Sequence, residues 1–361
     1  MDYPKHYQKL KSEVLRVLDD VLFTRADLIL RRDVREFEEN FASFLGTKYA
    51  VGVNSCTDAM HLALRAIGIK PGDEVITVAH TFVATVEAIV AAGGKPVLVD
   101  IGEDFNMDVE KLPRAISPRT KAIVPVHLNG RVCDMGRIMA VAREHKLVVM
   151  EDAAQALGAA YKGKKAGSFG AAGCFSFFPA KILGAAGDAG IVCTNSKNLA
   201  DKIRLLRDHG RKNKSEVVFY AFNSRLDNIQ AAILNLKLKY LPEWIALRRK
   251  LAERYRKGLS DVHNVKVPHF PASGYFDVYQ NYVIRAERRN GLVRYLNDKG
   301  VQTLISWPKP MHKHKGLGLQ GFSLPMTEKI SREVVSLPMN TEITNQEVDY
   351  VVKCIRQFYD H

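Results

Sequence analysis

The sequence predicts an α/β protein in which a large, doubly wound sheet domain is followed by a smaller α+β domain. From about Tyr49 to Asn195, short β-branched runs alternate with helix-like segments, which is typical of a sheet covered by helices on both faces. After about Leu241 the character changes, because a charged helical stretch precedes short strand candidates. The length of 361 residues also exceeds the roughly 100–200 of one domain. We therefore expect two domains, residues 1–240 and residues 241–361.

The predicted strands of the large domain are near-continuous apolar runs, as expected where both faces of a strand are covered. They are YAVGV (49–53), EVITV (74–78), KPVLVD (95–100), KAIVPVH (121–127), KLVVMED (146–152), CFSFF (174–178) and GIVCTN (190–195). Helix candidates lie between them at Asp58–Ile67, Thr81–Ala92, Met135–His145 and Asn198–Arg207. Seven strands that alternate with helices predict a single large sheet.

Both ends of the chain also contain helical patterns. In the first fifty residues, apolar side chains at helical spacing indicate an amphipathic region, with Tyr7, Leu10, Val14 and Leu18. The C-terminal domain is predicted to contain a long helix at 241–259, a strand at 281–286, and helices at 291–300 and 346–358. This mixture is typical of a small α+β domain.

The balance of charge is the unusual feature of the composition, since 53 Lys and Arg against 39 Asp and Glu give a net charge of +14. A nucleic acid, a membrane surface or an acidic small molecule could each account for such a charge. A nucleic-acid footprint would cluster basic residues among aromatic ones. Here the basic residues are spread along the chain, with small groups at 211–214, 248–250 and 309–315. We therefore expect no nucleic-acid partner.

Hydropathy and cysteine usage bear on location. No apolar run reaches the roughly 18 residues that a membrane span needs, and the N-terminal segment lacks the apolar core of a secretory signal. The five cysteines form no C-x-x-C pair and have no His or Cys at metal spacing. These patterns predict a cytoplasmic protein with reduced cysteines, no membrane partner and no metal site.

Two carboxylates, Glu151 and Asp152, follow the apolar strand that runs to Met150. Ligands of open α/β folds bind outside the carboxyl ends of the strands, so an acid at this position can meet a ligand. An acid at a strand end can also simply cap the next turn, and a single acid would favour that interpretation.

Lys181 follows the apolar run that ends at Phe178, and small residues come after it. Burial disfavours an ammonium group, so a lysine beside a buried strand can become a neutral nucleophile that forms a Schiff base. Most lysines instead extend into solvent. Ser176 precedes Lys181 by five residues, and in an extended run the two side chains would point to opposite faces. The turn at Pro179 must redirect the chain for them to meet.

Two further features follow predicted strands. The turn after the strand at 49–53 opens a helix and leaves the backbone N–H groups of Ser55, Cys56 and Thr57 free to bind an anion such as phosphate. Such turns also occur in ordinary strand–helix units. Phe82 follows the strand at 74–78, where an aromatic ring can lie flat against a planar ligand, although such a residue is more often part of the core.

A phosphate-binding turn, a flat aromatic ring, an acid and a lysine are together the parts needed to bind pyridoxal phosphate. From about Leu28 to about Val352 the sequence resembles the sugar aminotransferases of the DegT/DnrJ/EryC1/StrS family. The matching segments are VNSCTDAMHLALRAIGIKPGDEVITVAHTFVAT, KAIVPVHLNGRVCDM, VVMEDAAQALGAAYKGKKAGSFG, CFSFFPAKILGAAGDAGIVCTN and FNSRLDNIQAAIL. The resemblance implies a fold-type I transferase that depends on pyridoxal phosphate and has a large, mixed seven-stranded sheet.

The resemblance also implies roles around the cofactor ring. Lys181 corresponds to the catalytic lysine that forms the Schiff base and moves the proton. Asp152 corresponds to the carboxylate that pairs with the pyridinium nitrogen, and Gln155 to the residue that contacts the ring hydroxyl. Phe82 corresponds to the residue that stacks on the ring.

The cofactor phosphate is expected to bind Cys56, Thr57, Ser176 and Asn223. By resemblance Asn223 reaches in from a neighbouring subunit, which implies a homodimer. The family generally has glycine where Cys56 stands, so either the backbone approach to the phosphate differs or Cys56 adopts an ordinary conformation.

The implied reaction transfers an amino group from an amino acid, L-glutamate by resemblance, to a keto group on a nucleotide-linked sugar. Members with histidine in place of the lysine are sugar dehydratases, so the presence of Lys181 favours transamination. Candidates for lining the sugar site are His80, Arg225, Trp307 and His312. Packing is the alternative role for His80 and Trp307, and a dimer contact is the alternative for Arg225.

Two other functions are weighed against this one. A keto-cyclitol aminotransferase of an aminoglycoside-type pathway would share the same motifs. A non-catalytic nucleic-acid-binding protein would use the basic surface, but it would not need Lys181, Asp152 and Gln155 together. The charge of +14 also suits the aminotransferase, because pyridoxal phosphate, glutamate and a sugar diphosphate are all anions.

Overall fold

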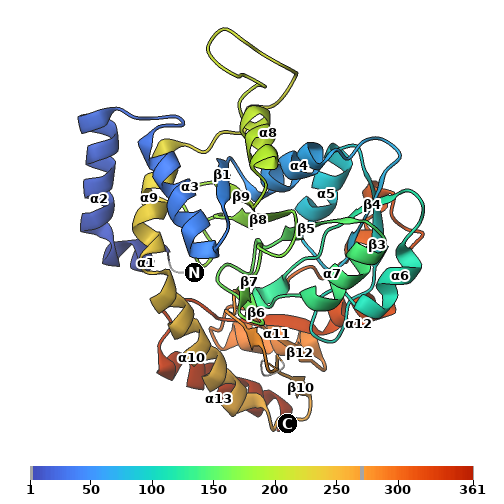
Figure 1. Cartoon of the computed structure of the whole chain (residues 1–361). Coiled ribbons are helices and arrows are strands. Elements are labelled where there is room, and N and C mark those ends of the chain that lie inside the picture. Colours follow the sequence, from blue (N-terminus) through green and yellow to red (C-terminus); the bar gives the residue numbers. More distant parts are fainter. Residues whose placement is uncertain (1–2, 269–271, 361) are drawn as a thin grey trace.

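The computed structural model describes residues 3–268 and 272–360. A large α/β body occupies the upper part of Figure 1, and the C-terminal elements lie below it. The chain passes from the first part to the second through the long helix α10 (Leu241–Leu259).

The centre of the large body is a seven-stranded sheet in the order β1-β9-β8-β5-β4-β2-β3. Its strands are β1 (Tyr49–Val53), β2 (Glu74–Val78), β3 (Lys95–Val99), β4 (Thr120–Ile123), β5 (Val148–Asp152), β8 (Ala172–Ser176) and β9 (Gly190–Thr194). Strand β9 runs antiparallel to β1 and β8, and the other neighbouring pairs are parallel. The predicted α/β class and the mixed, seven-stranded sheet are thereby confirmed.

Two predicted strands end earlier than their apolar runs. Strand β4 ends at Ile123, shortly before Pro125, which has no N–H to donate to a neighbouring strand. Strand β8 ends at Ser176, although the apolar run continues through Phe177 and Phe178. Past both points the chain still donates backbone hydrogen bonds to its neighbours, from the Val124 N–H to the Ile76 carbonyl at 2.7 Å and from the Phe177 N–H to the Ala189 carbonyl at 2.8 Å.

Helices cover both faces of the sheet. They are α3 (Arg32–Leu45), α4 (Cys56–Ile67), α5 (Val83–Ala91), α6 (Leu112–Ala115), α7 (Met135–Glu144), α8 (Lys197–Arg207) and α9 (Asn228–Leu238). Neighbouring residues of β9 belong to different hydrophobic clusters, Ile191 to one with Phe37 and Phe41 and Val192 to one with Leu62. Because strand side chains alternate between faces, the large body has one core on each side of the sheet.

The amphipathic region at the N-terminus is helical, as expected, with α1 (Tyr3–Lys9), α2 (Lys11–Asp19) and the π-helical turn η1 (Asp20–Arg25). Leu10 is buried and Val14 packs against the core cluster that contains Phe37. Phe23, by contrast, is 82 % exposed. This end of the chain therefore presents apolar side chains to the outside as well as to the core.

The C-terminal part has a three-stranded antiparallel sheet in the order β10-β12-β13, with β10 (Val265–Lys266), β12 (Tyr282–Ala286) and β13 (Val334–Leu337). Helices α10, α11 (Arg289–Asp298) and α13 (Asn345–Tyr359) enclose a separate cluster that includes Tyr255, Ile284 and Leu296. Trp244 and Ile245 at the start of α10 instead belong to a cluster of the large body. The division at residue 240 stays a prediction.

Smaller elements join the two parts. Helix α12 (Pro325–Glu333) begins where Asp100 accepts hydrogen bonds from Met326 and Thr327. A second three-stranded sheet pairs β6 (Ala160–Tyr161) with β7 (Lys164–Lys165) and β11 (Tyr275–Phe276). The single-turn 3₁₀ helices are η2 (Val109–Lys111), η3 (Leu128–Gly130), η4 (Met311–Lys313) and η5 (Lys315–Leu317).

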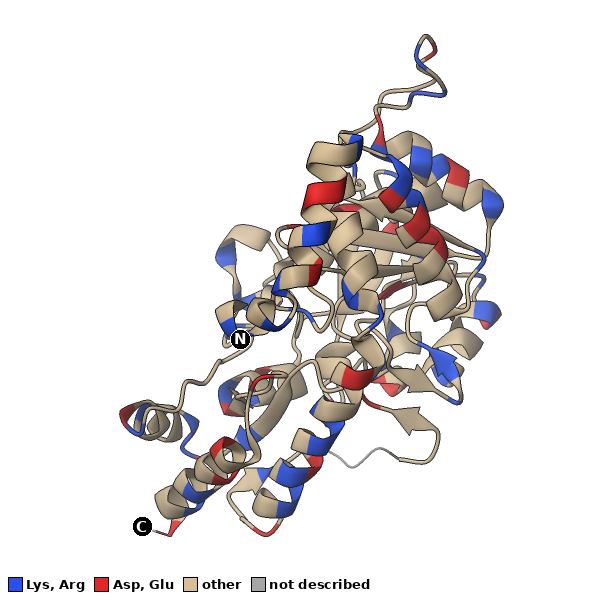
Figure 2. Cartoon of the chain, turned by 90° about the vertical axis from the view of Figure 1, so that its left-hand side faces the viewer, with Lys and Arg blue, Asp and Glu red and all other residues tan. Residues whose placement is uncertain are grey.

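A loop between α8 and α9 projects from the body above α8 (Figure 1). Residues 211–220 of this loop are all exposed. Figure 2 shows Lys and Arg interspersed with Asp and Glu over the ribbon, rather than gathered in one patch. Within the described ranges, no helix is both long and apolar enough to cross a membrane.

Candidate active site

A cavity of about 740 Å³ lies at the carboxyl edge of the sheet, between the large body and the C-terminal part. Eight of the twelve predicted site residues line it: Cys56, Thr57, Phe82, Asp152, Gln155, Ser176, Lys181 and Trp307. They come from the start of α4, the ends of β5 and β8, and the segments after β2 and before α12. Residues separated by up to 251 positions in the sequence therefore share one cavity.

Asp152 ends strand β5 and is 4 % exposed. Its Oδ2 accepts a hydrogen bond from the Thr85 hydroxyl at 2.7 Å, and its Oδ1 accepts one from the Ala154 N–H at 3.1 Å. In the described part of the chain, no Lys, Arg or His forms an ion pair with this carboxylate. The cavity wall thus holds a buried carboxylate whose partners are neutral.

Glu151 faces the other side of β5 and does not line the cavity. Its carboxylate accepts hydrogen bonds at 2.7 Å from the N–H groups of Gly167, Phe169 and Gly170, and His127 contacts it at 2.9 Å. Successive strand residues point to opposite faces, so one of the two neighbouring acids holds a loop while the other faces the cavity.

Lys181 follows β8 in a tight turn in which its N–H donates to the Phe178 carbonyl at 2.9 Å. Burial lowers the pKa of its amine, and the nearby Cys56 and Asp152 raise that pKa by a smaller amount. A larger fraction of the amine is therefore neutral at neutral pH than in an exposed lysine. The turn at Pro179 brings Ser176 and Lys181 to the same cavity, as their cooperation requires.

The start of helix α4 forms another wall of the cavity. Ser55 is its N-cap, since the Ser55 hydroxyl accepts a hydrogen bond from the Asp58 N–H at 3.1 Å. The N–H groups of Cys56 and Thr57 belong to the first turn and have no acceptor within the helix. Cys56 adopts an ordinary helical conformation and does not need the backbone freedom of glycine.

Phe82 is the N-cap residue of α5 and is 61 % exposed, although it lines a cavity. A phenyl ring left uncovered by the chain offers its face to a planar ligand.

Gln155 lies just after β5, and its side-chain oxygen bonds to one residue of the large body and one of the C-terminal part. Its Oε1 accepts hydrogen bonds from the Asn129 N–H at 2.9 Å and from the Asn281 Nδ2 at 3.3 Å.

Four of the predicted site residues lie outside this cavity. Asn223 is exposed at the base of the projecting loop, and Arg225 contacts Asp208 at 3.4 Å. His80 is buried behind the cavity wall, where its ring meets the Trp307 ring edge-to-face at 5.5 Å.

The two histidines among these four are held by other side chains. His80 Nδ1 lies 3.2 Å from the Ser331 hydroxyl, and burial lowers the pKa of the ring to about 4. His312 is also buried, with its Nε2 3.1 Å from Glu328. Across the described residues, no group of three or more His, Cys, Asp or Glu side chains is arranged to hold a metal ion.

The family model for the DegT/DnrJ/EryC1/StrS aminotransferase family matches residues 9–356. The chain belongs to this family. As in the expectation from the sequence, it is a fold-type I aminotransferase, and its relatives include transaminases of nucleotide sugars.

Three similar proteins illustrate the range of the family. A pleiotropic regulatory protein of Geobacillus stearothermophilus is 43 % identical, over 100 % of this aminotransferase and 98 % of the relative. The UDP-N-acetyl-3-dehydro-α-D-glucosamine 3-aminotransferase of Acidithiobacillus ferrooxidans is 40 % identical, over 99 % of this chain and 96 % of the relative. The crystal structure of S. venezuelae DesV in complex with a ketimine intermediate superposes with a TM-score of 0.96 at 37 % identity. The match covers 100 % of this chain and 98 % of the DesV chain.

Sequence reasoning missed several residues that line this cavity or support its walls. Thr85 lies three residues after Phe82, and only the fold reveals that its hydroxyl reaches Asp152. Gly190 on β9 lies against the start of α4, where a Cβ would be 2.3 Å from the Ser55 carbonyl carbon. Gln280 and Asn281 come from the C-terminal part and line the same cavity. The only signal for these two in the sequence was that they are amide residues at the start of the strand predicted at 281–286.

Proposed function

We propose that this protein binds pyridoxal phosphate in the 740 Å³ cavity and transfers an amino group from L-glutamate to the keto group of a nucleotide-linked sugar. The observation that carries the proposal is the meeting in one cavity of Lys181, whose amine pKa is lowered, with Asp152, a buried carboxylate without a cationic partner. When bound, pyridoxal phosphate supplies the electron sink that stabilises a carbanion at the amino-acid carbon.

The residues present are suited to this cofactor. The Asp152 carboxylate would hold a protonated ring nitrogen, because a buried anion favours a cation beside it. The free N–H groups of Cys56 and Thr57 would bind the phosphate at the positive end of the α4 dipole, together with the Ser176 hydroxyl. Phe82 would cover one face of the ring.

Lys181 would attach the cofactor through its neutral amine and would later move the proton between carbon atoms. Both tasks need an amine that is unprotonated part of the time, and burial supplies that condition. Asp152 and Lys181 would thus have complementary roles. The Asp152 carboxylate would keep the ring nitrogen of the cofactor protonated, and burial would leave the Lys181 amine free to accept a proton.

For the acceptor, we infer a sugar linked to a nucleoside diphosphate with its keto group at C3. The relative from Acidithiobacillus ferrooxidans, named for a UDP-linked 3-dehydro sugar, supports this choice. A keto-cyclitol is the alternative acceptor. Incubation with glutamate and UDP- or dTDP-linked 3-keto sugars, 4-keto sugars or keto-cyclitols, followed by mass spectrometry of the product, separates the three. Amination of the cyclitol alone would overturn the sugar assignment.

The cofactor assignment is tested by absorbance. The purified protein incubated with pyridoxal phosphate is expected to gain the visible band of a lysine-bound cofactor, and Lys181→Ala is expected to lose it. Lys197→Ala, which removes an exposed lysine paired with Asp201 on α8, is the matched control and should keep the band. A wild-type protein that remains colourless would contradict the proposal.

We also propose that the enzyme is a homodimer in which Asn223 of one subunit completes the phosphate site of the other. Asn223 is exposed and lies outside the cavity of its own chain, and the neighbouring loop carries exposed Val217, Val218, Phe219 and Tyr220. Exposed apolar side chains of this kind mark protein–protein contacts. Leu22 and Phe23 of the N-terminal region are further exposed candidates.

Subunit complementation tests the shared site. Lys181→Ala lacks the amine, and Asn223→Asp places a negative charge near the expected phosphate. A dimer that contains one chain of each kind retains one site with both residues intact. Mixing the two variants after unfolding and refolding should therefore restore activity that neither has alone. Monomeric protein in light scattering, or no recovery on mixing, would contradict the proposal.

We further place the reaction in the cytoplasm. All five cysteines are unpaired and buried, which suits a compartment that keeps thiols reduced. Fractionation of cells that express the tagged protein tests this location.

A further inference from the structure

The segment that leads into β12 places two amide side chains against the catalytic elements of the large body. Gln280 is buried, and its Oε1 accepts a hydrogen bond from the Ile182 N–H at 3.0 Å. Its Nε2 donates to the Ala180 carbonyl, also at 3.0 Å. The two residues that flank Lys181 are therefore bound to one amide, and the backbone of Lys181 cannot shift without breaking one of these bonds.

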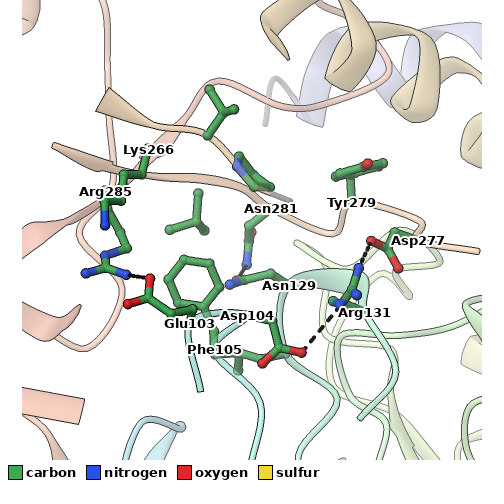
Figure 3. Close-up of a pocket in the computed structure, with 14 residues that line it drawn as sticks. Glu103, Asp104, Phe105, Asn129, Arg131, Lys266, Asp277, Tyr279, Asn281 and Arg285 are labelled. Carbon is green, nitrogen blue, oxygen red and sulfur yellow. Dashed lines mark hydrogen bonds and ion pairs between the residues drawn. The ribbon is translucent and has the colours of Figure 1, made fainter. Parts of the chain in front are cut away.

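Asn281 makes the corresponding contact with Gln155. Its Nδ2 lies 3.3 Å from Gln155 Oε1 and 3.3 Å from Asn129 Oδ1, and Figure 3 shows Asn281 and Asn129 facing each other. The Asn129 N–H also donates to Gln155 Oε1, at 2.9 Å. Because two donors meet the same oxygen, the Gln155 amide is fixed with Oε1 toward them, and its Nε2 remains as the donor available to the cavity.

The backbone that carries this pair is itself held in place. Arg248 is 1 % exposed, and its Nη1 donates to the carbonyls of Tyr279 at 3.1 Å and Gln280 at 3.2 Å. On the other side, the Val278 N–H donates to the Gly130 carbonyl at 2.9 Å. A Cβ on Gly130 would lie 2.6 Å from the Tyr279 nitrogen, so the two segments are in close backbone contact. The segment is thus bound to α10 and to the large body at once.

We propose that Gln280 and Asn281 are positioning residues for the proposed reaction, Gln280 by fixing the backbone on both sides of Lys181 and Asn281 by setting which way the Gln155 amide faces. The C-terminal part then determines the geometry of two groups that belong to the large body. This inference rests on the proposed binding of pyridoxal phosphate, and its tests use the capture and the spectrum of the cofactor rather than turnover.

The first test concerns Gln280. Gln280→Met keeps the volume of the side chain and removes both hydrogen bonds. Gln230→Met is the matched control, because Gln230 Oε1 accepts from the Ala186 N–H at 2.9 Å, in the same segment but away from Lys181. The rate at which each apo protein captures pyridoxal phosphate is measured against pH, together with hydrogen exchange at the Ile182 amide.

In Gln280→Met, the Lys181 amine is freer to reach water, so the midpoint of the capture profile should move to higher pH, by about half a unit or more. Ile182 exchange should accelerate at least about tenfold, because its acceptor is lost. Gln230→Met should change neither. If Gln280→Met does not fold, Gln280→Glu is the second variant, since it keeps the acceptor for the Ile182 N–H and removes the donor to the Ala180 carbonyl. Its Ile182 amide should still exchange slowly, and the pH midpoint of its capture profile should be shifted. An unchanged midpoint in a folded variant overturns the role of Gln280.

The second test asks whether Asn281 acts through Gln155. Asn281→Leu should shift the pH midpoint of the bound cofactor's absorbance change in the wild-type background. In a Gln155→Ala background the same substitution should have no further effect, since coupled residues are non-additive. An equal shift in both backgrounds overturns the role of Asn281. Wild-type protein that captures no pyridoxal phosphate would instead overturn the proposed function itself.

Discussion

The Thr85 hydroxyl donates to Asp152 Oδ2 at 2.7 Å and lies 2.8 Å from the Thr81 hydroxyl. Since a hydroxyl has one hydrogen and Thr85 gives it to the carboxylate, Thr81 must be the donor in the second contact. Thr85 lies in the first turn of α5, and Thr81 lies just before Phe82, the N-cap residue of that helix. The start of helix α5, which follows β2, thereby fixes the orientation of the acid that ends β5, two positions from β2 in the sheet.

Replacement of Thr85 with valine keeps the shape of the side chain and removes this hydrogen bond. We expect the Kd for pyridoxal phosphate to rise about three- to tenfold, because a net hydrogen bond contributes about 1 kcal/mol and Asp152 loses its preferred orientation. Equilibrium titration followed by absorbance measures the change. Thr77→Val removes a comparable buried bond, to the Val124 carbonyl, and should lower stability while leaving the Kd unchanged. Equal effects of both variants on the Kd would contradict a role for Thr85.

Replacement of Gly190 with alanine tests the contact between β9 and the start of α4. The new Cβ would lie 2.3 Å from the Ser55 carbonyl carbon and 2.7 Å from the Cys56 nitrogen, so the helix start must move. We expect weaker cofactor binding by at least about tenfold, with a loss of stability of about 1–3 kcal/mol. Gly316→Ala, where nothing lies within 4 Å of the added atom, should behave as wild type. Normal affinity in folded Gly190→Ala would show that the phosphate site lies elsewhere.

His80 gives the protein a predictable dependence on acid. Burial lowers its pKa from 6.5 to about 4, so the unfolded chain binds a proton in this window that the folded chain does not. Stability should therefore fall as the pH decreases from 7 toward 4, and by pH 5 the loss from this group is about 2 kcal/mol. Urea unfolding at pH 7 and pH 5 measures the free energy of unfolding, which should decrease less on acidification in His80→Gln than in the wild type.

The exposed His263 provides the control for this measurement. His263→Gln should lose as much unfolding free energy between pH 7 and pH 5 as the wild type, because the side chain at this position is exposed to water in the folded and the unfolded chain. If His80→Gln loses as much stability on acidification as the wild type, another buried group is responsible.

The net charge of +14 predicts an effect of salt on substrate capture. A basic protein raises the local concentration of anions, and salt screens this attraction over about 10 Å at 0.1 M. The KM for the sugar nucleotide should therefore rise between low and moderate ionic strength, while kcat stays constant. A KM that does not depend on salt would leave the charge without this role.

Particular residues show how far the sequence could lead. Lys181, Asp152, Phe82 and the turn at Ser55 each follow an apolar run, and the topology of an α/β sheet requires such positions to meet at one edge. The same logic could not place His80, which follows the apolar run of β2 and yet is buried against Ser331, or His312, which is buried against Glu328. Whether such a side chain turns toward the cavity or away from it depends on its packing neighbours, which the sequence pattern does not identify.

The order of apolar runs and turns in the sequence determined the α/β class and the seven strands, because periodicity is a local property, and the resemblance to the family pointed to Lys181 and Asp152. The tertiary structure decided the rest through contacts between distant segments. It turned Asp152 toward the cavity and Glu151 away from it, it seated Gly190 against the start of α4, and it brought Gln280 to the backbone around Lys181, 99 positions away. Contacts across such a separation depend on how helices and sheets pack, which no short stretch of sequence encodes.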